Sequence, residues 1–325
     1  MSAPPQSYIP SNMEYITLGR TGVQASVLGL GGGGHSRLGK SGGASVEESA
    51  RIVRRALELG INFIDTAEGY GTEEIVGRGL RDEQRDSVYI STKKSPRLND
   101  RLLTGDELAR GLEEILTRLQ TEYVDVYHLH GVRADQYDYA VSELVPTLMK
   151  LRDQGKLRFL GITEWFAADT GHEMLTRAVQ DEWWDVVMVG FNILNQSARD
   201  RVLAETARRN TGVLCMFAVR DALSRPEKLR QTVAELIEQG AIPRGAVDAD
   251  DPLGFVTDSG AAQTLPEAAY RFCRAEPGMH VVLSGTGNPD HLEENVAAIL
   301  KPPLPLDVRE RLVELFAGVD SVSGQ

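Results

Sequence analysis

The chain has 325 residues, of which 42% are hydrophobic and 25% are charged, and its formal net charge is −12. This composition is typical of a soluble globular protein, and so acidic a surface repels the phosphate backbone of nucleic acids. Residues 1–10 lack the features of a signal peptide, and no apolar run approaches the roughly 20 residues that span a bilayer. We therefore expect a cytoplasmic protein with no nucleic-acid or membrane partner. The two cysteines, Cys215 and Cys273, are expected to be buried thiols.

Short apolar segments alternate with longer amphipathic segments along the chain. Apolar runs predict strands at residues 25–31, 61–66, 87–92, 123–129, 157–162, 185–190, 212–219 and 280–284. Helices are predicted at residues 45–60, 72–80, 105–119, 141–154, 169–180, 198–210, 226–239 and 265–275. Eight strands that alternate with helices predict an α/β fold, a (β/α)8 barrel that forms one domain over residues 1–325.

A doubly wound sheet is the alternative, because residues 29–34 (GLGGGG) match the dinucleotide-binding pattern G-x-G-x-x-G after a strand. Asp65 also ends the second strand, as that pattern requires. However, roughly ten residues separate Gly34 from the helix start at Ser45, whereas a phosphate site needs the helix N-terminus directly at the glycines. The barrel is therefore favoured, and the glycines are interpreted as a loop.

The seventh and eighth strands are separated by more chain than the other neighbours. The extra segment, residues 241–261, is rich in Asp, Gly and Pro. A loop after the seventh strand of a barrel lies on the C-terminal face, where active sites form. We expect this insertion to contact the substrate, although a surface excursion is the alternative.

Four titratable residues lie at the ends of consecutive strands. Asp65 ends the second strand, Tyr70 follows it on the loop, Lys93 ends the third strand and His130 ends the fourth. Neighbouring strand ends share one rim of a barrel, so these side chains are expected to converge there. Each residue alone could be structural, but the combination points to a site.

The four residues together suit the reduction of a carbonyl group. A phenol holds its proton at neutral pH, so Tyr70 can supply the proton that the carbonyl oxygen receives. The ammonium of Lys93 would stabilise the phenolate that remains, and Asp65 would hold that ammonium in place. His130 could donate a hydrogen bond that orients the carbonyl oxygen.

The other histidines are interpreted as structural or solvated. His128 and His130 face the same way in one strand, but no other Cys or His stands at ligand spacing, so no metal site is predicted. His35 on the glycine loop is expected to be solvated. His172 is expected on the surface of a helix.

The chain resembles the aldo-keto reductase superfamily over residues 13–300. The resemblance lies in FIDTAEGYG, STKK, EYVDVYHLHG, LRFLGIT and LSGTGNPDHLEENV, in this order along the chain. It implies a (β/α)8 barrel that binds NAD(P)(H) in extended form without a Rossmann motif. It also implies that Asp65, Tyr70, Lys93 and His130 are the catalytic tetrad.

The resemblance implies a nicotinamide site with altered residues. Thr163 and Glu164 stand where the family usually has Ser-Asn, and Met188 stands where a glutamine is common, with Asn192 as a substitute nearby. Phe217 matches the aromatic residue that stacks on the nicotinamide, although a place in the barrel interior is equally compatible with its sequence. The usual Ser-Pro-Leu after it is replaced by AVR.

The resemblance also implies an adenosine site near the C-terminus. Gly285 and His291 replace the lysine and arginine that grip the 2′-phosphate of NADP in many members. NADP is slightly favoured by the family, but a strict choice between NADP and NAD is not predicted. The other residues assigned to this site are Thr286, Asn288, Glu294 and Asn295.

The expected substrate is a small carbonyl or alcohol, such as an aldehyde, a ketone or a sugar. Trp165 and Phe166 follow the fifth strand and are expected to line its pocket. The loops carry no cluster of basic residues, so an anionic substrate is not favoured. The alternative function is a cofactor-binding regulatory subunit, like the potassium-channel β subunits that resemble this family.

Overall fold

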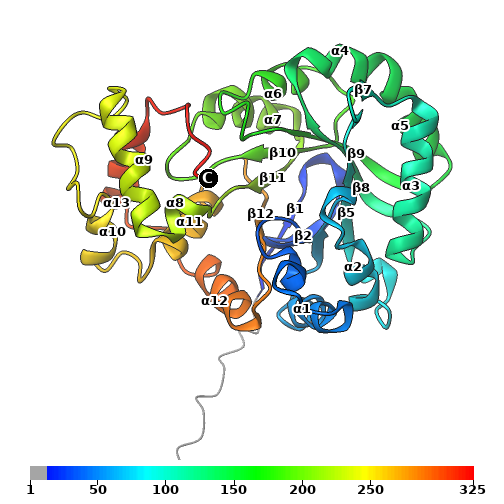
Figure 1. Ribbon diagram of the computed structural model, residues 1–325, viewed down its shortest axis with the longest axis horizontal. Coiled ribbons are helices and arrows are strands. Elements are labelled where there is room, and N and C mark those ends of the chain that lie inside the picture. Colours follow the sequence, from blue (N-terminus) through cyan, green and yellow to red (C-terminus); the bar gives the residue numbers. More distant parts are fainter. Residues whose placement is uncertain (1–12) are drawn as a thin grey trace, which may run out of the picture.

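A closed barrel of eight parallel strands forms the centre of the computed structural model, which describes residues 13–325. Around the barrel, each strand pairs with the next in chain order, and the last pairs with the first (Figure 1). The strands are β3 (Leu28–Gly31), β4 (Phe63–Asp65), β5 (Tyr89–Lys94), β8 (Val124–Val132), β9 (Leu157–Glu164), β10 (Val186–Gly190), β11 (Gly212–Met216) and β12 (Val281–Ser284). The predicted barrel is confirmed, and the doubly wound alternative is wrong.

Helices cover the outside of the barrel (Figure 1). The main ones are α1 (Val46–Glu58), α2 (Glu73–Gly79), α3 (Gly105–Leu119), α5 (Val145–Asp153), α6 (Glu173–Ala178), α7 (Ala204–Arg209), α11 (Leu265–Arg274) and α12 (Pro289–Ile299). Because strands such as β3 and β10 are buried along their whole length, their sequences are apolar on both faces. The predicted capping box at the start of α1 is confirmed, since Ser45 and Glu48 each accept the other's backbone N–H.

An antiparallel hairpin precedes the barrel and closes its N-terminal end. The segment predicted as one strand, residues 25–31, is two strands: β2 (Gln24–Ser26) pairs with β1 (Tyr15–Thr17), and β3 enters the barrel. Leu18 and Val23 from the hairpin are buried in the cluster of side chains that fills the barrel interior. Arg20 donates hydrogen bonds to backbone carbonyls just before β10. The barrel therefore has a packed floor.

Several helices differ from their predicted extents, and two of them show the reason. The helix predicted at residues 141–154 begins earlier, as α4 (Tyr137–Tyr139), and passes through a π-helical turn (Ala140–Leu144) before α5. The helix predicted at residues 169–180 is shortened to α6. The Asp169 carboxylate accepts the N–H groups of Glu173 and Met174, so the side chain caps a helix that begins four residues later.

The insertion after β11 folds at one side of the barrel. It follows α8 (Asp221–Ser224) and α9 (Pro226–Glu238) and contains α10 (Gly254–Asp258). Phe255 of α10 packs against Arg311 of α13 (Leu306–Phe316), with the guanidinium carbon 3.8 Å from the ring centroid. The insertion thus adheres to the C-terminal helix, and Figure 1 shows these elements together beside the barrel.

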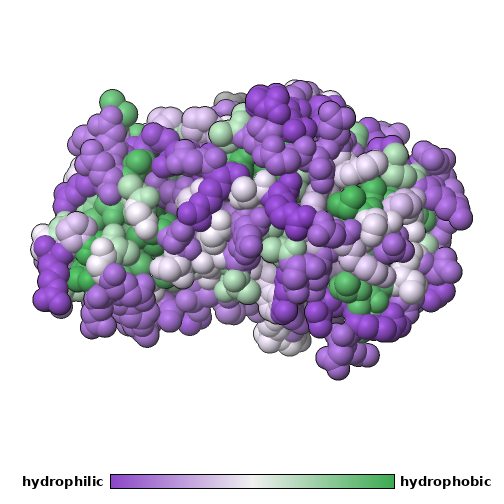
Figure 2. All heavy atoms as spheres, turned by 90° about the horizontal axis from the view of Figure 1, so that it is seen from above, coloured by the Kyte–Doolittle hydropathy of each residue, from purple (hydrophilic) through white to green (hydrophobic). Residues whose placement is uncertain are grey.

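Hydrophilic side chains cover most of the face in Figure 2, with apolar patches towards its two ends. Both cysteines, Cys215 and Cys273, are fully buried, as predicted. Within residues 13–325, no helix is both long and apolar enough to span a bilayer. Residues 1–10, for which no signal peptide is predicted, lie outside the described part of the chain.

Candidate active site

Asp65, Lys93 and Ser91 form a buried cluster at the C-terminal ends of β4 and β5. Lys93 Nζ lies 2.6 Å from Asp65 Oδ2 and donates a second hydrogen bond to the carbonyl of Thr66 over 2.8 Å. Ser91 Oγ donates to Asp65 Oδ1 over 2.7 Å, and His128 Nε2 lies 3.1 Å from Ser91 Oγ. Each oxygen of Asp65 therefore has its own partner, which fixes the carboxylate in place.

Full burial and mutual attraction act in opposite directions on the charges of Lys93 and Asp65. Burial disfavours the ammonium, but attraction to Asp65 and then to Tyr70 outweighs it, and the pKa of Lys93 is raised. Burial likewise raises the pKa of Asp65, while Lys93 and Ser91 oppose that rise. A cation at this place can stabilise a phenolate on Tyr70, because Lys93 Nζ lies 5.0 Å from the Tyr70 ring centroid.

Tyr70 and His130 meet above this pair. Tyr70 ends a 3₁₀ turn after β4, and its hydroxyl lies 3.4 Å from His130 Nε2 in β8, with the two rings edge to face. Burial, and then repulsion from Lys93, lower the pKa of His130 to about 3. The imidazole is therefore neutral at physiological pH and can donate one hydrogen bond without carrying charge. The predicted convergence of the four residues is present in the structure.

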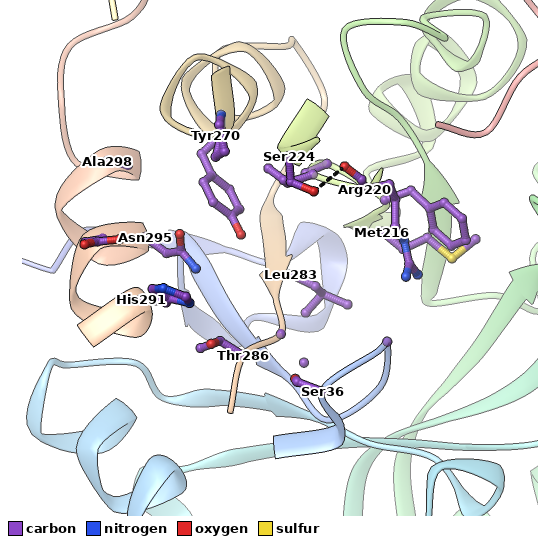
Figure 3. A pocket seen from close by; sticks show the side chains of 18 of the residues that line it. Ser36, Met216, Arg220, Ser224, Tyr270, Leu283, Thr286, His291, Asn295 and Ala298 are labelled. Carbon is purple, nitrogen blue, oxygen red and sulfur yellow. Dashed lines mark hydrogen bonds between the residues drawn. The ribbon is translucent and has the colours of Figure 1, made fainter. Parts of the chain in front are cut away.

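A cavity of about 1160 Å³ opens beside Tyr70 and extends to α12. Figure 3 shows Met216 and Arg220 at one side of it and His291, Asn295 and Ala298 at the other. Its volume is slightly above the range of roughly 300–1,000 Å³ for small-molecule sites. The residues predicted for catalysis or cofactor binding that line it are Asp65, Tyr70, Met188, Phe217, Gly285, Thr286, His291, Glu294 and Asn295.

One face of α12 supplies the far end of the cavity. His291, Glu294, Asn295 and Ala298 follow the i, i+3, i+4, i+7 spacing of a single helix face. Asn295 Nδ2 donates to Ser284 Oγ over 2.9 Å, which fixes the amide against β12. Asn288, which was assigned to the same site from the sequence, instead caps α12 through the N–H of Asp290 and lies outside the lining.

The pair predicted to hold the nicotinamide carboxamide, Thr163 and Glu164, is buried outside the cavity lining. Thr163 Oγ1 accepts the N–H of Gly131 over 2.9 Å. Glu164 lies 2.9 Å from His172 Nδ1 and accepts the N–H of Gly190 over 2.8 Å. The expectation that His172 lies on a helix surface is wrong: it is fully buried and precedes α6, because Glu164 needs a buried partner.

The Asn192 side chain forms its hydrogen bonds with other parts of the protein. Its Oδ1 accepts the N–H groups of Leu194 and Asn195, and its Nδ2 donates to the carbonyls of Phe217 and Ser323. An asparagine amide has two donor hydrogens and two main acceptor sites, so all of them are used. In this structure the Asn192 side chain holds the loop after β11, and its contact with the carboxamide stays a prediction.

Of the aromatic residues predicted for the site, Phe217 lines the cavity, whereas Trp165 and Phe166 do not. Trp165 is 45% exposed and stacks against Arg133, and Phe166 is buried, so neither belongs to the lining of the cavity as predicted for a substrate pocket. Phe166 instead packs edge to face against Phe217 with ring centroids 5.4 Å apart. Phe217, with a φ of +67°, is half-buried and lines the cavity rather than the barrel interior.

The insertion does not form the wall that was expected of it. Residues 241–261 are all described by the structure, and the lining includes none of them. The predicted contact between this segment and the substrate therefore has no support from the cavity lining and stays a prediction. The cavity is instead lined by residues at the start of α11, namely Gln263 and Thr264 just before the helix and Pro266 and Glu267 in its first turn.

Sequence reasoning missed two residues of the site. Ser91 alternates with Lys93 along β5, so strand periodicity already places both on one side of the strand. Arg220 follows β11 at the C-terminal rim, where charged residues frequently belong to a site, and it lines the cavity.

Comparison with known proteins agrees with this geometry. Residues 28–316 match the model of the aldo/keto reductase family. L-galactose dehydrogenase of Arabidopsis thaliana is 38% identical over 159 residues, which is 47% of this chain and 49% of that protein, so the chain spans about half of that relative's length. A probable voltage-gated potassium channel subunit beta of the same plant is 25% identical over 93% of this chain and 97% of its own.

A solved structure has the same fold. A thermostable aldo-keto reductase in complex with the inhibitor epalrestat superposes with a TM-score of 0.70 at 25% identity, covering 93% of this chain and all of that chain. The match over most of the barrel, together with the arrangement of Asp65, Tyr70, Lys93 and His130, leads to one conclusion. The chain belongs to the aldo/keto reductase family.

Proposed function

We propose that this protein is an NAD(P)-dependent oxidoreductase that interconverts a small carbonyl compound and its alcohol. The observation that carries the proposal is the position of the Tyr70 hydroxyl. It lies beside neutral His130, in front of the buried Lys93–Asp65 pair, and at the edge of a large cavity. A proton donor supported by a buried cation is what the carbonyl oxygen requires.

The residues of the chain divide the proton chemistry between them. Tyr70 donates its proton to the carbonyl oxygen, or accepts one from the alcohol in the reverse direction. Lys93 stabilises the phenolate during that transfer, and Asp65 keeps the ammonium in place. His130 donates a hydrogen bond that orients the oxygen, since its neutral ring keeps one N–H.

The cavity fits a dinucleotide in size and in the chemistry of its lining. When bound, a nicotinamide cofactor supplies the hydride. Thr286, Glu294 and Asn295 offer donors and acceptors that suit the adenosine half, while Met188 and Phe217 offer an apolar surface near Tyr70. Gly285 and His291 add no permanent cation for a 2′-phosphate, so we propose that the enzyme has no strict preference between NAD and NADP.

The test follows the absorbance of NADH and NADPH with a panel of aldehydes, ketones and sugars. The wild type should turn over at least one substrate, and Tyr70→Phe should lose most of the turnover while its cofactor affinity stays within about twofold. If cofactor binds but no carbonyl is reduced, the alternative gains support, namely a regulatory subunit like the potassium-channel relative. If neither dinucleotide binds, both functions are excluded.

A further inference from the structure

Arg220 extends into the cavity without a partner for its charge (Figure 3). Its guanidinium forms no hydrogen bond or ion pair with any of residues 13–325; its backbone carbonyl, by contrast, accepts from Ser224 Oγ. The guanidinium carbon lies 3.8 Å from the centroid of the Phe217 ring. Stacking on an aromatic face leaves the edge of the guanidinium, which carries its N–H donors, free to bind something else.

Three of the four carboxylates that line the cavity already have a basic side chain within ion-pair distance. Asp221 lies 3.3 Å from His35 Nε2 and 3.5 Å from Arg225 Nη1. Asp65 is paired with Lys93, and Glu267 is paired with Arg271 and with Lys301. Arg220 therefore forms no ion pair with these acidic residues.

Arg220 also lies close to the proton donor. A Cβ added at Gly33 would lie 2.8 Å from the Tyr70 ring, and one added at Gly34 would lie 3.7 Å from Arg220 Nη1. Because adjacent residues have Cα atoms about 3.8 Å apart, one short stretch of loop touches both side chains. A group bound to Arg220 would thus be near the atoms that react at Tyr70.

A half-buried guanidinium without a partner loses hydration and gains little in return. Burial lowers the pKa of Arg220, and attraction to Tyr70 and Asp221 opposes that shift. Arginine nonetheless keeps its charge in proteins, and its planar fork of N–H groups binds carboxylates and phosphates in pairs of hydrogen bonds. The local excess of positive charge is compensated when an anion enters the cavity.

We propose that Arg220 binds an oxyanion of the ligand close to Tyr70. The inference rests on the proposed function and extends it, because it gives the site a class of ligand that composition did not favour. The oxyanion has two sources, the diphosphate of the dinucleotide or a carboxylate on an acidic carbonyl substrate. Both would use the same guanidinium edge.

The experiment compares the wild type with Arg220→Gln, which removes the charge at similar length, and with Arg220→Lys, which keeps it. Arg225→Gln is the matched control, since Arg225 lines the same cavity but is paired with Asp221. Calorimetric titrations use three anionic probes, namely NADH, inorganic diphosphate and 4-carboxybenzaldehyde. Benzaldehyde is the uncharged control for the last of these. Circular dichroism melts confirm that each variant is folded.

If the diphosphate is the source, Arg220→Gln lowers the affinities for NADH and inorganic diphosphate by roughly 10- to 100-fold, which is the effect expected from the loss of a charge-assisted hydrogen bond. If a substrate carboxylate is the source, Arg220→Gln lowers the affinity for 4-carboxybenzaldehyde by that factor. The affinities for NADH and benzaldehyde then change less than twofold. Arg220→Lys should recover part of either loss, and Arg225→Gln should show neither.

The proposal is overturned if Arg220→Gln binds every anionic probe within twofold of the wild type, or if the wild type binds none of them. Failure of the proposed function is separate from this result. It would show as a wild type that does not bind NADH, and in that case the diphosphate and carboxybenzaldehyde titrations still decide whether Arg220 holds an anion.

Discussion

Ser91 Oγ donates a 2.7 Å hydrogen bond to Asp65 and so fixes the carboxylate oxygen that Lys93 does not contact. The same hydroxyl lies 3.1 Å from His128 Nε2, which is itself fully buried. The position of the Lys93 ammonium beneath Tyr70 therefore depends on a serine that never touches the phenol. This dependence can be tested directly.

Ser91→Ala should cost about 1–3 kcal/mol of unfolding free energy, because it leaves a buried carboxylate oxygen without a donor. It should also lower kcat, since the Lys93–Asp65 pair loses one of its constraints, with little change in cofactor Kd. Denaturant unfolding and steady-state kinetics measure the two effects. Ser87→Ala, an exposed serine before β5, should change stability by less than about 0.5 kcal/mol. Equal effects at the two serines would contradict the assignment.

Lys93→Met should destabilise the protein by about 3–5 kcal/mol, because it leaves Asp65 charged and unpaired in the interior. Adding Asp65→Asn to that variant should restore much of the stability without restoring turnover. The neighbouring Lys94, which is paired with the partly exposed Glu68, serves as the control, and Lys94→Met should cost less than Lys93→Met. If the double variant regains activity together with stability, the pair has a structural role alone.

Asn192 and Asn195 both hold the C-terminal tail, but Asn192 also contacts the loop after β11. Asn192 Nδ2 donates to Phe217 and Ser323, whereas Asn195 Nδ2 donates to Thr170 and Val322. Both alanine variants should lower the melting temperature. Asn192→Ala should in addition weaken cofactor binding, because the Phe217 carbonyl loses its anchor. Equal cofactor Kd values for the two variants would show that Asn192 does not support cofactor binding.

The unfolding free energy should rise with pH across the acid range. The pKa of His130 is about 3 in the folded protein, against roughly 6.5 for an ordinary histidine, so between these values the unfolded chain binds a proton that the folded chain does not. The slope from this group is positive and at most about 1.4 kcal/mol per pH unit. His130→Gln should reduce the slope of urea-unfolding free energies between pH 4 and 6.5. An unchanged slope would show that His130 already titrates normally.

The sequence was sufficient for the barrel and for the acid–base residues because both follow from local periodicity. Eight apolar runs mark the strands, and strand ends at Asp65, Lys93 and His130 meet on one rim in any such barrel. Ser91 could have been added by the same alternation. The proton chemistry was therefore predictable from the order of strands.

The residues after β9 and β11 could not be placed in that way. Glu164 and Asn192 were assigned by their positions along the chain, but partners distant in sequence determine where they point: His172 for the first and Ser323 for the second. The position of the insertion also depends on a partner distant in sequence, since its Phe255 packs against Arg311 of α13. Long-range packing determines where such side chains point, and the pattern of apolar residues in a strand carries no information about that packing.

The floor formed by the β1–β2 hairpin has a kinetic consequence. With Leu18 and Val23 filling the N-terminal end of the barrel, molecules reach Tyr70 from the cavity side. Because cofactor and substrate enter through the same opening of the cavity, the one that binds deeper binds first and leaves last. Steady-state kinetics should therefore show a compulsory order of binding. Release of the more deeply bound reactant is expected to be the slowest step.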